Sequence, residues 1–217
     1  MHCDDRVVAS YDAVAARYAE EIGDELDDKP IDRALYACFA ELVGAGARVG
    51  DVGCGPGHVT RHLADLGLDI VGVDPSPGMI TVARRRYPGL AFRGGSLTDL
   101  GEEDGAWSGA VAPYSLIHLA PADRSAAYAE LARTIAPGGW LLVSFHVSMS
   151  DQAPGSVKHL DDWWGHEVDL DFYFLDPADI ETGLSDAQFR TMSRMEREPW
   201  PDVEAQSRRC YLLAHRQ

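Results

Sequence analysis

Apolar residues recur every three or four positions near the start of the chain, a spacing that predicts helices with one buried face. The first such helix carries Val7, Val8, Tyr11, Val14, Ala15 and Tyr18. The stretch "DELDDKP" ends it, and Pro30 suits the first position of a second helix, which stops at "GAGA". Residues 1–45 are therefore predicted to be a helical segment that covers the rest of the domain.

Farther along, short apolar runs alternate with helical patterns. The predicted strands are "ARVGDVG", "DIVGVD", "LAFRGG", "GAVAPYSLIHL" and "WLLVSFHV". The helices between them are "HVTRHLADLG", closed by Gly67, "SPGMITVARRRYP", with Ser76 as N-cap and Pro77 in the first turn, and "PADRSAAYAELARTIAPGG", closed by Pro-Gly-Gly. Connections this long require parallel pairing, with helices on both faces of the sheet.

The C-terminal part has a different pattern. Residues 147–175 show no clear helical or strand period and are interpreted as an insertion that caps a substrate pocket. A helix "PADIETGLSDA" and two strands, "QFRTMSRMERE" and "RRCYLLAHRQ", follow, and "PWPDVEAQ" joins the strands as an antiparallel hairpin. The prediction is a single α/β domain over 1–217, a doubly wound Rossmann-like sheet of seven mostly parallel strands with an antiparallel C-terminal hairpin.

Composition narrows the classes of function. The chain has 217 residues, 46% of them hydrophobic, and 35 acidic against 19 basic residues give a formal charge of −16. So negative a surface repels phosphate backbones, which argues against a nucleic-acid partner. No apolar run approaches the roughly 20 residues that cross a bilayer, and "MHCDDRVVAS" lacks the features of a signal peptide. A soluble cytoplasmic protein, monomer or homodimer, is expected.

The four cysteines, Cys3, Cys38, Cys54 and Cys210, are scattered and form no C-x-x-C pair. They are expected to be free thiols in a reducing compartment. The histidines and acids show no tight ligand spacing either, so no metal site is predicted.

The stretch "VGDVGCGPGH" places Gly53, Gly55 and Gly57 directly after the first parallel strand. Its spacing differs from the G-x-G-x-x-G of dinucleotide sites. Asp51 stands before the glycines, where a carboxylate suits a cationic group such as an α-amino group better than a pyrophosphate. Asp74 ends the second strand and can accept hydrogen bonds from both ribose hydroxyls, or act only as a helix cap. The pattern indicates a site for an amino-acid nucleoside.

Four motifs in order, "DVGCGPG", "VGVDPSPGMI", "GGSLTDL" and "LARTIAPGGWLLVSF", resemble the class I S-adenosylmethionine-dependent methyltransferases over about residues 5–147. The chain is also similar to actinomycete small-molecule methyltransferases of secondary metabolism. The resemblance implies S-adenosyl-L-methionine as cofactor and S-adenosyl-L-homocysteine as product. The sequence departs from the family at Ser96, where an acid often stands, and at Gly109, where the strand usually opens with Asp.

The resemblance also implies roles for individual residues. The methionine part of the cofactor would be surrounded by Asp51, Gly53, Cys54, Gly55, Gly57, Tyr114 and Ser115. The ribose and adenine would lie against Asp74, Pro75, Ser76, Met79, Gly95, Ser96 and Leu97. Tyr11 and Tyr18 belong to a helix that closes over the cofactor in such families, although ordinary helix packing explains them equally well.

Methyl transfer from a sulfonium is an in-line displacement, in which a base helps when the acceptor is protonated. His118 follows the fourth strand and is the candidate general base, with a purely structural histidine as the alternative. The aromatic insertion "HLDDWWGHEVDLDFYF" suits a lid over an apolar acceptor, or a cluster that anchors a long loop. The candidate acceptor-binding residues are His146, Trp163, Trp164, His166, Tyr173 and Arg209.

The predicted function is therefore methyl transfer from S-adenosylmethionine to an oxygen or nitrogen of a small molecule. The alternatives are methylation of a peptide or protein terminus, and a non-catalytic protein that binds the cofactor or serves as a scaffold. A small-molecule acceptor is the expected partner. Its identity and the atom that receives the methyl group do not follow from the sequence.

Overall fold

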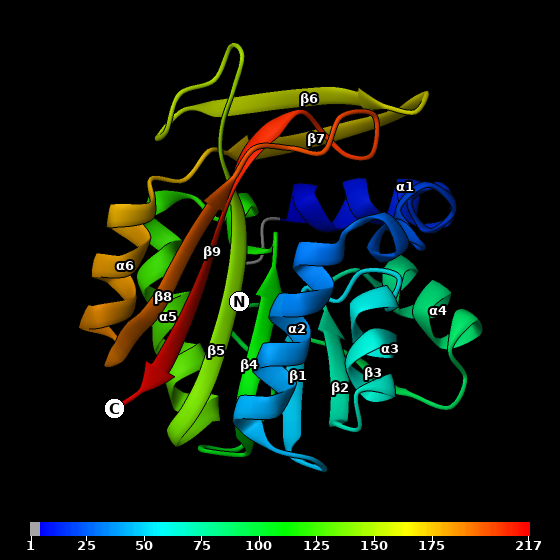
Figure 1. The fold of residues 1–217 in the computed structure, drawn as a ribbon. Coiled ribbons are helices and arrows are strands. Elements are labelled where there is room, and N and C mark those ends of the chain that lie inside the picture. Colours follow the sequence, from blue (N-terminus) through cyan, green and yellow to red (C-terminus); the bar gives the residue numbers. More distant parts are fainter. Residues whose placement is uncertain (1–4) are drawn as a thin grey trace.

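A seven-stranded sheet with the order β3-β2-β1-β4-β5-β9-β8 forms the centre of the computed structural model, which describes residues 5–217 (Figure 1). Cys3 and the first four residues of the predicted 1–45 segment lie outside the described residues. The strands are β1 Arg48–Val52, β2 Asp69–Asp74, β3 Ala91–Gly94, β4 Trp107–Pro113, β5 Ile135–Met149, β8 Phe189–Arg197 and β9 Ser207–Arg216. Only β9 pairs antiparallel with its neighbours β5 and β8. The predicted fold class is confirmed.

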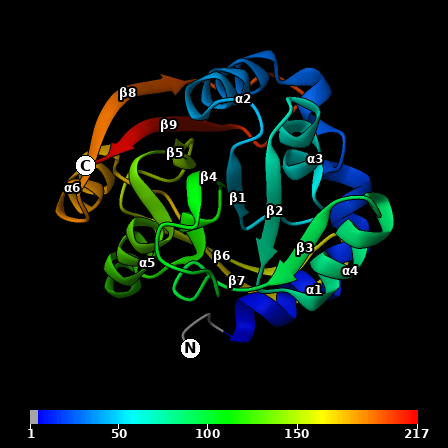
Figure 2. The same ribbon diagram turned by 90° about the horizontal axis from the view of Figure 1, so that it is seen from below.

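Helices cover both faces of the sheet (Figure 2). They are α1 Asp5–Ile22, α2 Pro30–Val43, α3 His58–Asp65, α4 Pro77–Arg86, α5 Pro121–Thr134 and α6 Pro177–Asp186, with short 3-10 turns η1 Glu25–Asp28 and η2 Leu116–His118. Side chains of α2 and α3 form one buried cluster with β1, and those of α5 and α6 form a larger one on the opposite face. Both clusters consist of the apolar stripe that each helix shows in sequence.

The predicted helix ends agree with the structure except at α5. Ser76 caps α4 by accepting a hydrogen bond from the backbone N–H of Met79 at 3.0 Å, and Gly67, with φ +89°, follows α3. The predicted closure of α5 by Pro-Gly-Gly is wrong, because the helix already ends at Thr134. Ile135 instead pairs with Trp107 of β4, and this pairing draws the next residues into β5.

The insertion over residues 147–175 is ordered, which the sequence analysis did not predict. Strands β6 Val157–Trp163 and β7 His166–Tyr173 form a separate antiparallel hairpin. Trp164 and Gly165 make its two-residue turn with φ of +55° and +79°, the backbone signs of a type I′ turn. In β7 the apolar Val168, Leu170 and Phe172 alternate with acids, a strand signal too short to stand out.

The hairpin and α1 lie together over the carboxyl ends of the parallel strands (Figure 1). Val14 of α1 is buried against Val168 and Leu170 of β7, and tyrosines of α1 pack against this cluster. Helix α1 is also tied to the start of α4, because Asp12 accepts hydrogen bonds from the Ser76 hydroxyl and from the backbone N–H of Gly78. Two segments distant in sequence therefore build one cover.

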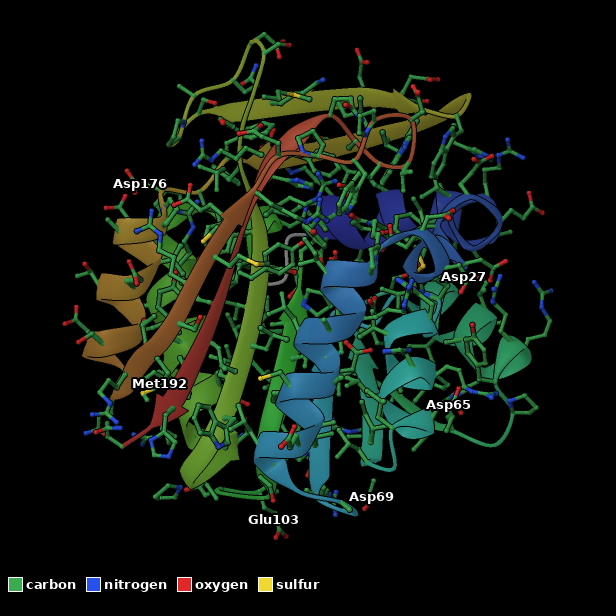
Figure 3. All side chains as sticks on the ribbon, viewed as in Figure 1. Asp27, Asp65, Asp69, Glu103, Asp176 and Met192 are labelled. Carbon is green, nitrogen blue, oxygen red and sulfur yellow. The ribbon has the colours of Figure 1, made fainter. Side chains whose placement is uncertain are left out.

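The acidic excess lies on the outside. Asp27, Asp65, Asp69 and Glu103 are exposed and point away from the core (Figure 3). Cys38, Cys54 and Cys210 are free thiols. Among the helices formed within residues 5–217, none has both the length and the apolar character to span a bilayer.

Candidate active site

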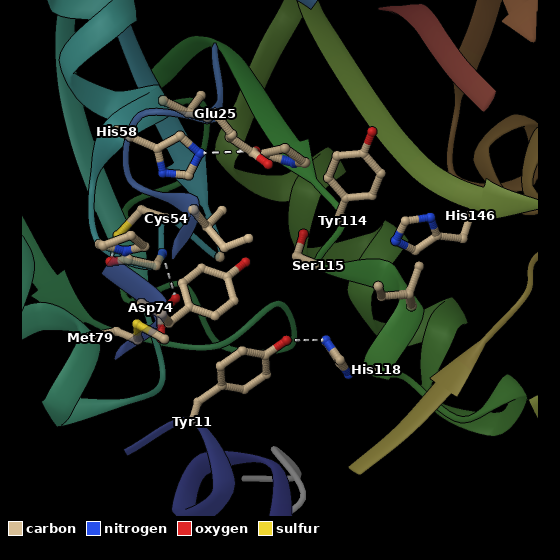
Figure 4. A pocket seen from close by; sticks show the side chains of 18 of the residues that line it. Tyr11, Glu25, Cys54, His58, Asp74, Met79, Tyr114, Ser115, His118 and His146 are labelled. Carbon is tan, nitrogen blue, oxygen red and sulfur yellow. Dashed lines mark hydrogen bonds and ion pairs between the residues drawn. The ribbon is translucent and has the colours of Figure 1, made fainter. Parts of the chain in front are cut away.

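A cavity of about 310 Å³ lies beneath α1 and the hairpin, at the carboxyl ends of β1, β2 and β4 (Figure 4). Its walls come from the glycine turn, the end of β2, residues 95–98, residues 113–119 and α1. In open α/β sheets this edge is the place where ligands bind.

The glycine turn brings bare backbone to the cavity wall. Gly53 and Gly55 have φ of +76° and +52°, a region that side chains rarely adopt. A Cβ on Gly53 would lie 2.5 Å from the Cβ of Ser115 on the neighbouring loop. Glycine is required at position 57 for a different reason. A Cβ there would lie 2.7 Å from the Phe92 ring, and the residue lies behind the cavity wall. The first two glycines thus shape a cradle, and the third serves helix packing.

Asp74 lines the cavity with a carboxylate that the backbone orients. One oxygen accepts a hydrogen bond from the N–H of Gly55 at 2.8 Å, and the other from the N–H of Ser76 at 2.9 Å. Burial raises the pKa of Asp74 to about 6 against the lowering effect of these two bonds. Each oxygen keeps a lone pair for a ligand hydroxyl. The bond to Ser76 two residues on is also an Asx-type turn. Ser76, and not Asp74, is the N-cap of α4, and the contact of Asp74 with a ribose stays a prediction.

Asp51 is fully buried and does not belong to the cavity lining. The Thr60 hydroxyl donates to one of its oxygens at 2.6 Å, while the other oxygen has no partner within residues 5–217. Burial raises its pKa to about 6. Its predicted contact with a cationic ligand group therefore stays a prediction, with the carboxylate one layer behind the wall.

His118 is held between α1 and the hairpin (Figure 4). Its Nδ1 lies 3.2 Å from the carbonyl oxygen of Asp171 in β7, and its Nε2 lies 2.7 Å from the Tyr11 hydroxyl. Because a carbonyl oxygen only accepts, Nδ1 carries the proton and Nε2 accepts from Tyr11. Burial lowers the pKa of His118 to about 4, so the ring is neutral at physiological pH.

The opposite end of the cavity holds a cluster of charges, of which the sequence had indicated only Arg209. Glu204 lies 2.5 Å from Arg197, 3.2 Å from Arg209 and 3.4 Å from Lys29. Arg197 also pairs with Asp32 at 2.9 Å. These residues come from β8, from β9, from the loop between these strands, and from α2 and the residue before it. Because they are far apart in the sequence, no local spacing of residues predicts the cluster.

Lys29 extends the cluster toward the glycine turn. Its ammonium lies 2.6 Å from Glu25, which in turn lies 3.3 Å from Nε2 of His58 at the start of α3. Burial alone would raise the pKa of Glu25, but His58 and Lys29 lower it to about 2. The Glu25 carboxylate is therefore ionised throughout the physiological range.

Most of the predicted site residues line this one cavity: Tyr11, Tyr18, Gly53, Cys54, Gly55, Asp74, Pro75, Met79, Gly95, Ser96, Leu97, Tyr114, Ser115, His118, His146, Trp163 and Arg209. Gly57 and Asp51 stand behind the wall, and Ser76 is buried as the cap of α4. Their positions follow from the three-dimensional packing of the turn and helices.

Three residues predicted to contact the acceptor lie elsewhere, and the structure corrects that expectation. Trp164 sits at the hairpin turn and stacks on Trp163 at 4.7 Å between ring centroids. His166 is exposed. Tyr173 packs against the guanidinium of Arg124 at 5.3 Å from its ring centroid. Strand alternation turns Tyr173 away from its neighbour Phe172, which lines the cavity. Trp164 and His166 lie at the turn end of the hairpin.

Comparison with known proteins shows which proteins share the fold and part of the sequence. Residues 49–139 match the model of a family described as a methyltransferase domain. Over this part of the sequence the chain is similar to a methyltransferase domain. It is 34% identical to demethylmenaquinone methyltransferase of Beutenbergia cavernae over 140 residues, which are 64% of this chain and 57% of that protein. The chain thus spans somewhat more than half the length of this relative.

Two solved structures share the fold. One is 1,6-didemethyltoxoflavin-N1-methyltransferase of Burkholderia thailandensis with bound substrate and S-adenosylhomocysteine (TM-score 0.72, 20% identity, 100% of this chain and 92% of that chain). The other is the [4+2]-cyclase SpnF (TM-score 0.74, 19% identity, 97% of this chain and 95% of that chain). A fold shared by two such different reactions leaves the chemistry to the site.

The residues at the glycine turn fit the cofactor of the family. Gly53 and Gly55 line the cavity with backbone that carries no side chain, and Asp74 presents free lone pairs at the end of β2. Ser115 Oγ and His58 Nδ1 belong to cavity-lining residues, and both atoms are buried without a hydrogen-bond partner within residues 5–217. A buried polar atom without a partner is costly, and a polar ligand relieves that cost.

Proposed function

We propose that the protein transfers a methyl group from S-adenosyl-L-methionine to an oxygen or nitrogen of a small molecule, leaving S-adenosyl-L-homocysteine. The observation that carries this proposal is the single cavity, with the glycine cradle and Asp74 on one side and His118, His146 and Arg209 on the other. The residues on both sides line the same cavity. An in-line displacement between two bound molecules requires such a shared space.

The cofactor, when bound, supplies a methyl group on a sulfonium that is already activated. The chain's own residues position and shield it. Gly53 and Gly55 admit close backbone approach, and Asp74 accepts the ribose hydroxyls. We propose that α1 and the hairpin act as the lid, because Tyr11, Tyr18 and Trp163 close the cavity from above.

A protonated acceptor must lose a proton as the methyl group arrives. We propose that this proton passes to the Tyr11 oxygen while the Tyr11 proton passes to Nε2 of His118, along the 2.7 Å hydrogen bond. The Asp171 carbonyl holds the ring in the tautomer that leaves Nε2 free to accept. With its pKa lowered to about 4, His118 is a weak base, so this relay favours acceptors whose own proton is acidic.

The cover over the cavity favours a small molecule over the rival acceptor, a peptide or protein terminus, which needs an open cleft. Cytoplasmic location and a monomeric or homodimeric state remain predictions from the sequence. The relatives and structural neighbours are named for different acceptors, among them demethylmenaquinone and 1,6-didemethyltoxoflavin.

Two measurements test the proposal. Calorimetric titration with S-adenosylhomocysteine is expected to show binding that Asp74→Ala weakens by about 10²-fold or more, the loss of two hydrogen bonds to a charged group. Asp65→Ala, at an exposed carboxylate paired with Arg61, is the matched control. Labelled methyl transfer into a cell extract, separated by size, then distinguishes small molecules from proteins. Absence of cofactor binding refutes the proposal, and binding without any transfer supports the non-catalytic alternative.

A further inference from the structure

Arg209 differs from the other cations of the charged cluster. Lys29 forms an ion pair with Glu25, and Arg197 forms one with Asp32. Both also pair with the shared carboxylate of Glu204. Arg209 has only the shared carboxylate, at 3.2 Å from its Nη2, and gives its Nη1–H to the carbonyl of Ser207 at 2.7 Å. Its Nε–H has no hydrogen-bond partner within residues 5–217, although the side chain is 2% exposed.

The strand register places Arg209 at the end of the cavity opposite the glycine turn, where the acceptor is proposed to bind. Arg209 of β9 is directly opposite His146 of β5, and opposite residues of an antiparallel pair share one face of the sheet. Both line the cavity together with Tyr114, whose ring centroid lies 5.8 Å from the Arg209 guanidinium carbon and 4.9 Å from the His146 ring. Cation, imidazole and phenol therefore converge on one wall.

The local potential at this wall is positive. Burial lowers the pKa of His146 most, followed by the charges of Arg209 and Lys29. Together they bring this pKa to about 3, although Glu204 raises it. His146 is therefore neutral. Its Nδ1 is engaged with the Ser207 hydroxyl at 2.6 Å, which orients the ring.

We propose that this wall, formed by Arg209, His146 and Tyr114, binds a carboxylate of the methyl acceptor, so that the acceptor is a small organic acid. The inference rests on the proposed function and deepens it. A carboxylate oxygen accepts a guanidinium N–H of Arg209 that has no protein partner within residues 5–217, a charge-assisted hydrogen bond. The apolar neighbours Ile117, Leu119 and Phe172 suit a hydrocarbon or aromatic body on that acid.

The experiment compares matched acids and amides on the protein saturated with S-adenosylhomocysteine. The probes are benzoate and benzamide, cinnamate and cinnamamide, and indole-3-acetate and indole-3-acetamide, titrated by calorimetry or by ligand-observed NMR. Each pair has the same shape and differs in charge. At least one acid is expected to bind about tenfold or more tighter than its amide, the discrimination of one hydrogen bond to a charged group.

Variants assign the preference to its residue. Arg209→Gln is expected to abolish the preference for the acid and Arg209→Lys to keep part of it. Arg208→Gln is the matched control, because that neighbouring side chain is 46% exposed and pairs with Glu196 and Glu198 outside the cavity. Thermal unfolding of each variant checks that it is folded.

Several outcomes overturn the inference: no acid binds, acids and amides bind equally, or the preference survives Arg209→Gln. If Arg209→Gln does not fold, the wild-type comparison of acids and amides decides by itself. Failure of S-adenosylhomocysteine to bind at the outset is a failure of the proposed function and not of this inference, so the two are distinguishable.

Discussion

Replacing His118 by glutamine is expected to make the stability of the protein less sensitive to acid. In the unfolded chain a histidine titrates near 6.5, while burial lowers the pKa of His118 in the folded protein to about 4. Between these values the unfolded state binds more protons, so folding stability falls as pH falls through this window.

The magnitude follows from the two pKa values. Between pH 7.5 and pH 5, the linkage relation gives a loss of at most about 2 kcal/mol from His118, at 1.36 kcal/mol per pKa unit. It is an upper value because the ring is only partly buried and borders the cavity. Glutamine retains an acceptor for Tyr11 and a donor for the Asp171 carbonyl but does not titrate. The variant should therefore lose less stability over this range.

Urea unfolding at a series of pH values from 5 to 7.5 measures the effect, read as the difference between wild type and variant. Subtraction is needed because Asp51 and Asp74, with pKa values raised to about 6, contribute the opposite slope. His146→Gln is a matched control from the same cavity and should flatten the dependence in the same direction. Parallel curves for wild type and His118→Gln, or an NMR titration of His118 near 6.5, would refute the reasoning.

Three further predictions concern the lid and the cradle. Asp12→Ala removes the hydrogen-bond acceptor at the start of α4. It should lower the free energy of unfolding in urea by about 1–2 kcal/mol and weaken S-adenosylhomocysteine binding in calorimetry. Asp65→Ala should do neither, and equal effects of the two variants would contradict the role of Asp12 in docking α1. Gly53→Ala combines a φ of +76° with a 2.5 Å clash, while Gly67→Ala has φ of +89° and open space, so the first should be about 1–3 kcal/mol more destabilising. Tyr11→Phe breaks the proposed relay and should lower kcat about a hundredfold in a methyl-transfer assay at saturating cofactor; an unchanged kcat would exclude the relay.

Much of the fold could be predicted because it follows from local patterns of apolar and polar residues. Strand residues of β1, β2 and β4 are apolar in short runs, and the helices between them have one apolar stripe. Gly53, Gly55 and Asp74 could be placed at the cavity as well, because parallel strands end at the same edge of a sheet. The β6–β7 hairpin was missed because only three apolar residues alternate in it.

The acceptor side of the cavity could not be predicted in this way. His118 meets Tyr11 across 107 positions and the Asp171 carbonyl across 53, and Arg197 meets Asp32 across 165. The sequence indicates His118 and Tyr11 as candidate site residues, but it does not indicate that they contact each other, and it does not indicate Arg197, Asp32 or Asp171 at all. Trp164, His166 and Tyr173 were named as candidates with Trp163 because they belong to one aromatic segment, yet only Trp163 of these four lines the cavity.

The sequence by itself thus determined the strands of the main sheet, the helices, the glycine turn and the resemblance to methyltransferases, since a period of buried positions and a backbone turn depend on neighbouring residues. Only the tertiary structure decided that α1 and the hairpin form one cover, that His118 is neutral and bonded to Tyr11, and that Arg209 faces the cavity with an unpaired donor. The physical reason is that burial and charge pairing depend on which distant segments pack together, and local periodicity records only that a face is buried, not what buries it.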